Sequence, residues 1–296
     1  DLEKKQIKFY KTNESELLKF LKNEMQSRMK RNYMPIVIKL LLESSNHFTT
    51  VQEIRKTFDV LNFERGSFVS SGSRPLGNTA IAAVRKALKE FTTFPESTSE
   101  GDVKLIENKF KESDKKECLK ICGQEIAKWH IKEYGEPTLW RIKPGDENKG
   151  WKYLDEFIKT NSIGVGWNGF GDLSKFETED DVYRHIDKVK HNFNSKSSVA
   201  TISHKMSKKD LVVLTKAQQE LVDFGIIVGN YEFQEKGDES YAHRRRVVWL
   251  NQGPILENHL PENTLGGSRS TAHEVKEISK KEGFLSILIG NNIKKV

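Results

Sequence analysis

Hydrophobic residues in the first third of the chain recur every three or four positions, which is the spacing of the buried face of an amphipathic helix. The pattern predicts four helices, which span residues 14–30, 35–43, 51–58 and 78–91. Glu53 follows Thr50 by three positions, as in a capping box, so Thr49 or Thr50 is expected to cap the third helix.

Two short β-prone runs follow these helices, at residues 91–94 and 103–106, and the turn formers of residues 95–102 separate them. Three helices followed by a hairpin is the order of a winged helix, in which the last helix enters the major groove of DNA and the hairpin touches the backbone. The expected DNA contacts are Arg74, Asn78, Arg85, Lys86 and Lys89. The alternative is a small helical domain for protein contacts, whose charges only solvate one face.

A long helix is expected over residues 113–134, and Gly135 is placed to end it. Cys118 and Cys122 lie four positions apart, on one face of this helix. Two sulfurs do not complete a four-ligand zinc site, and no pair of histidines stands near them in the sequence. A buried apolar role in a reducing, cytoplasmic setting is therefore expected for both cysteines.

After this helix the chain changes to short alternating or apolar runs that are typical of strands. Strands are predicted over residues 138–143, 162–167, 210–215, 224–233 and 244–250. Helices are predicted over residues 151–160, 179–193 and 271–282. The sequence thus predicts an α+β protein with a helical domain over residues 1–110, a connector helix over 111–136, a small curved or barrel-like sheet with flanking helices over 137–252, and a C-terminal extension over 253–296.

Composition narrows the class of protein. The net charge of +7 is compatible with a polyanionic partner. No apolar run approaches the roughly 18 residues of a membrane span, and no signal peptide is visible in the charged first residues. The chain carries no phosphate-binding lysine loop, no dinucleotide fingerprint and no histidines at metal-ligand spacing. We therefore expect a cytoplasmic, non-catalytic protein without a cofactor or a metal.

Five segments of the second half, taken in order, resemble the EVE/YTH branch of the PUA-like fold. They are residues 138–145 (TLWRIKPG), 162–174 (with the motifs IGVGW and GDLS), 206–214 (MSKKDLVVL), 224–233 (FGIIVGNYEF) and 241–249 (YAHRRRVVW). Asp210 fits the family's lysine–x–glycine–aspartate pattern, whereas Lys209 replaces the usual glycine. The first two segments together are most similar to N-terminal domains of McrB-type restriction proteins. The resemblance does not extend to residues 1–135.

This resemblance implies a pocket that holds a base flipped out of the nucleic-acid stack, where aromatic walls and a buried methyl group offset the cost of flipping. Trp167 matches the first cage aromatic of the YTH pattern, and Tyr241 falls where that pattern has a second one. The other expected pocket residues are Asn168, Asp172 and Val165. The alternative is that Trp167 belongs to the core, as is expected for Trp140 and Trp249.

The densest positive run in the chain suggests contacts with phosphates. The expected contacts are His243, Arg244, Arg245 and Arg246, with Lys205, Lys208 and Lys209 nearby. Alternation along a strand would place Arg244 and Arg246 on one face and Arg245 on the other. The alternative is an edge strand whose charges only prevent pairing with other chains.

The sequence and the resemblance together predict recognition of modified, above all methylated, DNA by base flipping. The chain would then be the targeting part of a modification-dependent restriction system, in which a motor or nuclease subunit supplies catalysis. Three alternatives stay open: a module that binds methylated RNA, a winged-helix transcription regulator or protein-interaction chain, and a nuclease with an unrecognised site. The identity of the modified base is left open.

Overall fold

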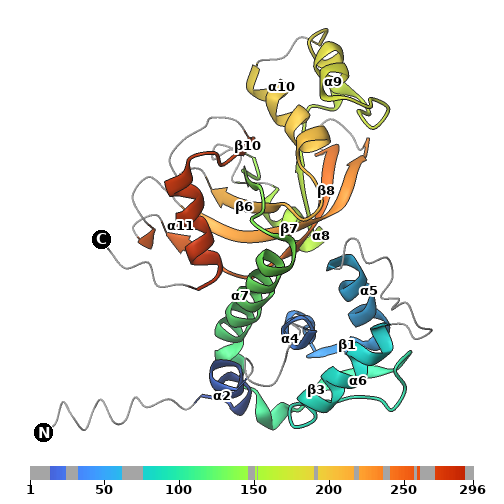
Figure 1. Cartoon of the computed structure of the whole chain (residues 1–296), viewed down its shortest axis with the longest axis vertical. Coiled ribbons are helices and arrows are strands. Elements are labelled where there is room, and N and C mark those ends of the chain that lie inside the picture. Colours follow the sequence, from blue (N-terminus) through green and yellow to red (C-terminus); the bar gives the residue numbers. More distant parts are fainter. Residues whose placement is uncertain are drawn as a thin grey trace, which may run out of the picture. The chain divides into compact units, whose positions relative to one another are not determined.

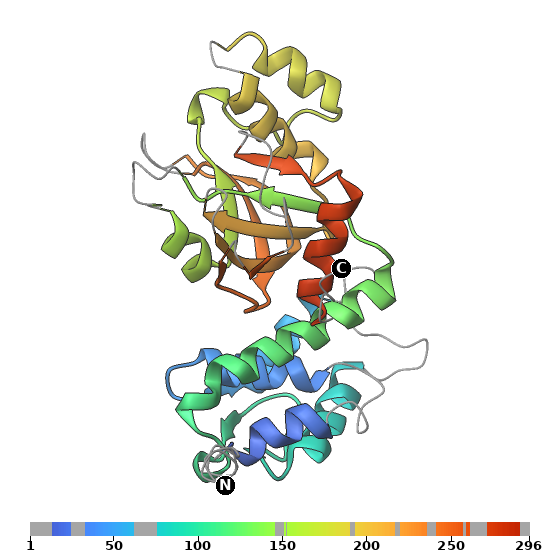
Figure 2. The ribbon, with the colours of Figure 1, turned by 90° about the vertical axis from the view of Figure 1, so that its left-hand side faces the viewer.

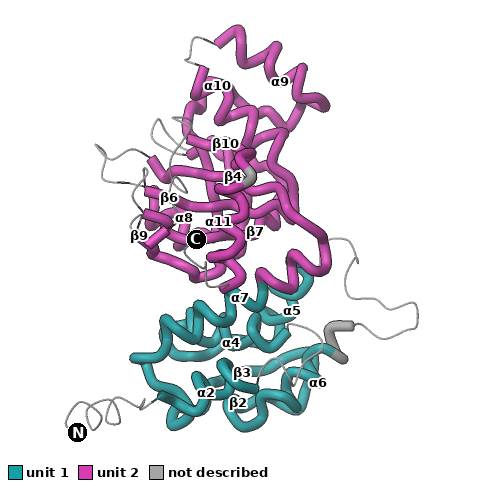
Figure 3. Tube along the Cα trace, turned by 60° about the vertical axis from the view of Figure 1, so that its left-hand side comes forward, with its two compact units in different colours: residues 1–126 teal, residues 127–296 magenta. Residues whose placement is uncertain are grey.

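The computed structural model of the chain describes residues 14–24, 33–61, 76–145, 151, 153–189, 193–216, 220–235, 241–256, 259–260 and 271–290. The chain is a mixed α+β protein that divides into two compact units, Asp1–Ile126 and Ala127–Val296 (Figure 3). The division falls inside helix α7 (Lys115–Tyr134), which is the helix that the sequence predicts as a connector.

Unit 1 begins with helices whose apolar faces form its core. They are α2 (Glu16–Asn23), α4 (Tyr33–Glu43), α5 (Val51–Leu61) and α6 (Leu76–Leu88). The Ser15 hydroxyl accepts a hydrogen bond from the Leu18 amide at the start of α2, and the Thr50 hydroxyl accepts one from the Glu53 amide at the start of α5. These hydroxyls satisfy amides that a helix leaves without an internal partner, which confirms the capping prediction for Thr50.

A three-stranded antiparallel sheet completes unit 1. Its strands are β1 (Phe48–Thr50), β2 (Thr92–Thr93) and β3 (Asp102–Leu105), in the order β1-β3-β2. The β2–β3 hairpin was predicted, whereas strand β1 was not. Phe48 pairs with Lys104, and this distant partner makes a strand of three residues that is too short to leave a periodic pattern.

Helix α7 ends as its sequence predicts. Gly135 has a φ of 83°, in the left-handed region that favours glycine, and its amide donates to the Ile131 carbonyl. Cys118 and Cys122 are both fully buried, and burial raises the pKa of the Cys118 thiol to about 12. The buried role expected for these cysteines is confirmed. Within the residues that the structure describes, no group of three metal-ligating side chains is found.

Unit 2 is built on a seven-stranded sheet (Figure 1). Its strands are β4 (Leu139–Ile142), β5 (Ser162–Val165), β6 (Leu211–Lys216), β7 (Glu220–Phe233), β8 (His243–Trp249), β9 (Ile255–Leu256) and β10 (Ala272–Glu274). Their order is β10-β4-β6-β7-β8-β5, and β9 pairs with β7. Strands β4 and β6 are parallel, while the other pairs are antiparallel. No ladder joins β5 to β10 among the described strands, so the predicted barrel remains a prediction.

Helices pack around this sheet. They are α8 (Leu154–Thr160), α9 (Glu179–Ile186), α10 (Phe193–Ala200), which continues into the π-helical turn Thr201–Lys205, and α11 (Ile278–Leu288). Helix α11 packs on the sheet (Figure 2). The rings of Phe284 on α11 and Phe224 on β7 meet edge to face, with centres 6.1 Å apart. No helix in the described ranges is long and apolar enough to cross a membrane.

Two helix predictions in unit 2 were wrong. The single helix expected over residues 179–193 is two helices, α9 and α10. The helix expected over residues 271–282 begins instead with strand β10, which pairs with β4, and α11 follows it. Strand β10 exists because β4 offers it a pairing edge, and this partner lies more than a hundred residues earlier in the sequence.

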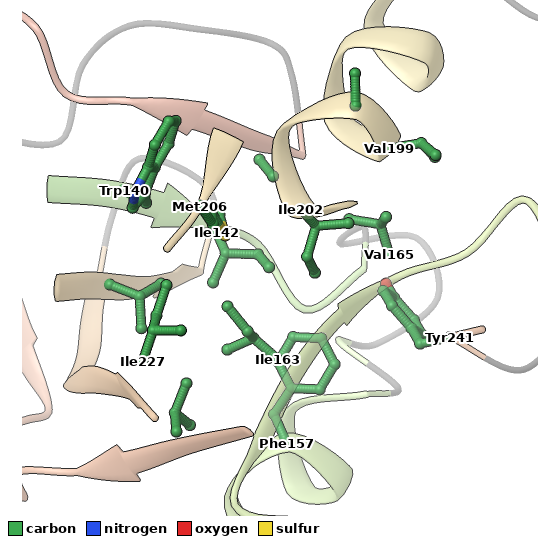
Figure 4. Packing of buried hydrophobic residues seen from close by; sticks show 14 of the residues in the cluster. Trp140, Ile142, Phe157, Ile163, Val165, Val199, Ile202, Met206, Ile227 and Tyr241 are labelled. Atoms are coloured by element: carbon green, nitrogen blue, oxygen red, sulfur yellow. The ribbon is translucent and has the colours of Figure 1, made fainter. Parts of the chain in front are cut away.

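The main core of unit 2 lies on one face of the sheet (Figure 4). Trp140 and Trp249 belong to it, as predicted, and are 4% and 3% exposed. Their indole N–H groups donate to the Asp210 carboxylate at 2.8 Å and to the Phe157 carbonyl at 3.1 Å. Asp210 also accepts a hydrogen bond from the Ser207 amide. This carboxylate therefore fixes the start of β6 and gives the buried indole N–H of Trp140 the hydrogen-bond partner that it needs in the core.

Candidate functional site

Trp167 stands between the core and the surface of unit 2. It lies two residues after strand β5 and directly before the short 3-10 turn Asn168–Phe170. Its φ of 65° lies in the left-handed region, which costs a residue with a β-carbon about 1–2 kcal/mol. The ring packs, only partly buried, against the core. Bulky residues keep such a conformation only where their surroundings impose it, and such positions concentrate at binding sites.

A chain of hydrogen bonds fixes both ends of the segment 167–173. The Leu173 amide donates to the Tyr231 hydroxyl at 3.3 Å, and this hydroxyl lies 2.7 Å from Nδ1 of His243. Nε2 of His243 lies 3.4 Å from the Trp167 carbonyl oxygen. The Trp167 carbonyl oxygen can only accept, so Nε2 carries the imidazole proton and donates to it. Nδ1 of the neutral ring is then an acceptor, and the Tyr231 hydroxyl donates to it. We call His243 and Tyr231 the clamp.

The sequence-based role of His243 as a phosphate contact was wrong. Its side chain is fully buried, and burial is the main reason that its pKa falls from 6.5 to about 4. The Trp167 carbonyl and the nearby Asp172 carboxylate oppose this fall in pKa only in part. Burial likewise raises the pKa of the Tyr231 phenol. Both clamp residues are thus neutral near pH 7, as their hydrogen bonds require.

Tyr241 and Val165, predicted as pocket residues, lie in the core. Tyr241 is 6% exposed, and its ring centre lies 3.8 Å from that of Tyr153 and 5.2 Å from that of Phe157 (Figure 4). A β-carbon on Gly164 would come within 3.0 Å of the Tyr241 β-carbon, so the glycine is what lets this ring lie over β5. Val165 is fully buried, and its side chain is not available to a ligand in this arrangement.

Asn168 and Asp172 lie in the segment that the clamp holds. Asn168 is partly buried at the start of the 3-10 turn. Asp172 is exposed, and its carboxylate accepts from both the amide and the hydroxyl of Ser174 at 2.9 Å. Asp172 therefore shapes a local turn. The structure brings both residues into one segment with Trp167, as the sequence predicts.

The basic residues of β8 point alternately to the two faces of the sheet. Residues 243, 245, 247 and 249 are buried, while Arg244 is partly buried and Arg246 is exposed. The predicted alternation is confirmed. Arg244 forms an ion pair with Glu156 at 2.5 Å, and Arg246 forms one with Glu232 at 3.2 Å. Arg246 keeps a side-chain exposure of 61%, so it is the arginine of this run that is open to a phosphate.

The phosphate contact predicted for Arg245 was wrong. Its guanidinium is buried and donates to the carbonyls of Ile202 at 2.5 Å, Ser203 at 2.9 Å and Gly229 at 3.3 Å. The first two carbonyls belong to the π-helical turn after α10, and the third belongs to the irregular stretch of β7. Arg245 therefore ties α10 to the sheet, with all its hydrogen bonds inside the protein.

The three lysines expected near this run have different surroundings. Lys205 pairs with Glu179 at 2.8 Å and lies over the ring of Tyr183. Lys208 is exposed, as a phosphate contact requires. Lys209 is partly buried, and its ammonium lies 5.0 Å from the ring centre of Tyr134.

Lys209 has a φ of 78°, so the position where the resembled family carries glycine is left-handed in this chain. Replacing Lys209 with glycine is therefore expected to raise the free energy of unfolding by about 0.5–1 kcal/mol, because relief of the left-handed strain exceeds the added chain entropy. Urea denaturation measures the change. The matched control, Lys208→Gly, lies outside the left-handed region and is expected to lower stability. A loss of stability in both variants would contradict the prediction.

In unit 1, Arg85 is another predicted DNA contact with a different role. Its guanidinium donates to the carbonyls of Pro95 at 3.1 Å and Glu96 at 2.6 Å, in the loop of the β2–β3 hairpin. Arg55 on α5 donates to the Thr98 carbonyl in the same loop. These two arginines hold the hairpin loop against the helices. Because Arg85 is only partly buried, the DNA contact predicted for it stays a prediction.

Lys86 lies on α6 and Lys89 directly after it, and both side chains are exposed, as the predicted contact with DNA requires. The hairpin loop, however, carries the exposed acids Glu96 and Glu100, which disfavour contact with phosphates. Any duplex bound by unit 1 would therefore meet α6 rather than the hairpin loop. Of the remaining predicted contacts, Arg74 and the side chain of Asn78 lie outside the described residues.

Comparisons with known proteins concern unit 2. A family model described as a domain of unknown function (DUF8426) matches residues 140–277. The match begins within β4 and ends one residue before α11, so it covers all seven strands of the large sheet together with Trp167 and the clamp. No curated protein and no solved structure matches the chain. Unit 2 is thus similar to a family whose function is not described.

Proposed function

We propose that this chain recognises modified DNA without catalysing a reaction, and that unit 2 holds a flipped-out base against Trp167. The observation that carries the proposal is Trp167 itself: a large aromatic ring just after a buried strand, partly exposed, in a strained backbone conformation that its surroundings hold. A ring in this position offers a stacking surface for a base, worth about 1–3 kcal/mol.

Two further features support the proposal. The five segments that resemble the EVE/YTH branch supply β4, β5, β6, β7 and β8 in that order. The left-handed Lys209 occupies the family's glycine position, which accounts for glycine being usual there. With Tyr241 in the core, a second wall for the base would have to come from residues other than Tyr241.

Unit 1 supports a duplex as the partner. Helices α4, α5 and α6 precede the β2–β3 hairpin, and β1 pairs with β3 to tie the hairpin to the helices. This order resembles that of a winged helix, whose last helix would read the major groove. On α6 and directly after it, Lys86 and Lys89 would meet the phosphates. Such a pair of domains fits the targeting part of a modification-dependent restriction system, with a separate motor or nuclease subunit.

A titration with short duplexes that differ in one base tests the proposal: unmodified, 6-methyladenine, 5-methylcytosine or 5-hydroxymethylcytosine, at near-physiological salt, with matched RNA as a further arm. The full chain is expected to prefer one modified duplex. Trp167→Ala is expected to weaken binding of that duplex about tenfold to a hundredfold, because a stacked base is worth about 1–3 kcal/mol, and to remove the preference.

The control replaces Lys86 and Lys89 together with glutamine. This variant is expected to bind all four duplexes more weakly and to keep the preference, because phosphate contacts carry no information about the base. Equal affinity of the full chain for all four duplexes, unchanged by Trp167→Ala, would overturn the proposal. Preference for the modified RNA would replace DNA with RNA as the partner.

A further inference from the structure

The clamp joins three parts of unit 2 that are distant in the sequence. His243 lies on β8, Tyr231 on β7, and the clamped segment follows β5. The rings of His243 and Tyr231 are stacked, with centres 5.9 Å apart and planes 20° apart. One side of this pair binds the Trp167 carbonyl, where the segment begins, and the other binds the Leu173 amide, where it ends.

The Trp167 carbonyl accepts a hydrogen bond from the Phe170 amide at 3.1 Å inside the 3-10 turn, and a second one, from β8, ties this strained residue to the sheet. The imidazole of His243 donates this second bond from a fully buried site. A short polar chain in which each member has a partner and the imidazole is fully buried favours one geometry, because rotation of the imidazole leaves a buried polar group unpaired.

We propose that His243 and Tyr231 are positioning residues for the base-binding site, and that they hold the Trp167 ring in the orientation in which it receives a base. This inference rests on the proposed function, and it adds the residues that set the geometry of the site and the protonation state in which they do so.

The clamp works in one protonation state only. A proton added to Nδ1 would turn the acceptor of the Tyr231 hydrogen into a donor, and the Tyr231 oxygen would then face two donors with its own hydrogen unpaired. The titratable groups that face His243 from neighbouring elements are the carboxylate of Asp172, in the clamped segment, and the neutral phenol of Tyr231. On its own strand, Arg245 shares the buried face. Burial outweighs Asp172 and keeps the pKa of His243 low, so the clamp is intact near pH 7.

The test begins with the full chain without nucleic acid. Tyr231→Phe keeps the stacked ring and removes only the hydroxyl. The matched control, Tyr183→Phe, removes a hydroxyl from a partly buried ring of the same unit outside the clamp. The readouts are the indole NMR signal of Trp167, assigned with Trp167→Phe, and quenching of tryptophan fluorescence by acrylamide. We expect the Trp167 signal to shift or broaden and quenching to increase in Tyr231→Phe alone.

A second variant, His243→Gln, replaces the imidazole with an amide side chain. The amide can donate and accept hydrogen bonds, and it does not titrate. In the wild-type chain the Trp167 signal is expected to change with a midpoint near pH 4, the folded pKa of His243, while folding is followed by circular dichroism. In His243→Gln this change should be absent. The preferred duplex is expected to bind about tenfold more weakly to Tyr231→Phe at pH 7, as for the loss of one buried hydrogen bond.

The two proposals fail in different ways. An unchanged Trp167 signal and unchanged quenching in both Tyr231→Phe and His243→Gln would overturn the clamp as a positioning device, whatever the duplex titration shows. A response of Trp167 in Tyr231→Phe and not in Tyr183→Phe supports it. Whether the wild-type chain prefers a modified duplex is decided separately, by the titration described above.

Discussion

Replacing Arg245 with alanine is expected to lower the free energy of unfolding by about 3–4 kcal/mol, because three carbonyl groups lose the buried guanidinium that satisfies them. Two of these carbonyls lie in the π-helical turn after α10, so the loss also frees this turn from the sheet. Thermal and urea denaturation of the full chain measure the effect, and hydrogen exchange of the α10 amides reports where it acts.

The neighbouring residue provides the control for this experiment. Arg246 has the same side chain on the opposite face of β8, with 61% exposure and a surface ion pair to Glu232. Such pairs contribute little, so Arg246→Ala is expected to change stability by less than about 0.5 kcal/mol. Equal losses in the two variants would show that Arg245 does not carry the structural role that its contacts indicate.

Stability is expected to fall as the pH drops from 6.5 to about 4, with His243 contributing roughly 3 kcal/mol at most. The sign follows from the folded pKa of about 4, which lies below the ordinary value of 6.5. Between these values the unfolded chain binds a proton that the folded chain does not. The contribution is therefore fully present above pH 6.5 and is lost as the pH falls towards 4.

Other groups titrate in the same range, and they do not all act in the same direction. Burial raises the pKa of the Asp210 carboxyl, which favours the folded state at lower pH. The difference between wild type and His243→Gln isolates the histidine, because Asp210 is present in both. Urea denaturation at several pH values is expected to give a steeper dependence for the wild type. Parallel curves would contradict the buried, neutral state of His243.

The sequence alone predicted most of the regular elements, because their signals are local. Helices α4, α5, α6 and α7 follow the spacing of apolar residues, and Thr50 and Gly135 mark ends through groups within four residues. The strands with long apolar or alternating runs were found for the same reason. The α+β class was therefore readable from the chain, whereas closure of the large sheet was not.

The alternation along β8 also indicates which of its basic residues are buried. Trp249 was expected to lie in the core, and Arg245 and His243 are in phase with it along the strand. Continuing this phase would have placed both basic residues inside. Their positive charge suggested phosphates instead, although a buried arginine or neutral histidine is stable wherever the fold supplies partners.

The sequence by itself determined most of the helices, the alternation along β8 and the core positions of Trp140 and Trp249, because periodicity and capping act over a few residues. Only the tertiary structure decided that β1 and β10 are strands, that Arg85 and Arg245 bind carbonyls, and that Tyr231 and His243 hold Trp167. In each case the deciding partner is remote along the chain or comes from another strand. The role of a short strand or of a polar side chain depends on the group that it contacts in the folded protein, and the residues near it in the sequence do not determine that contact.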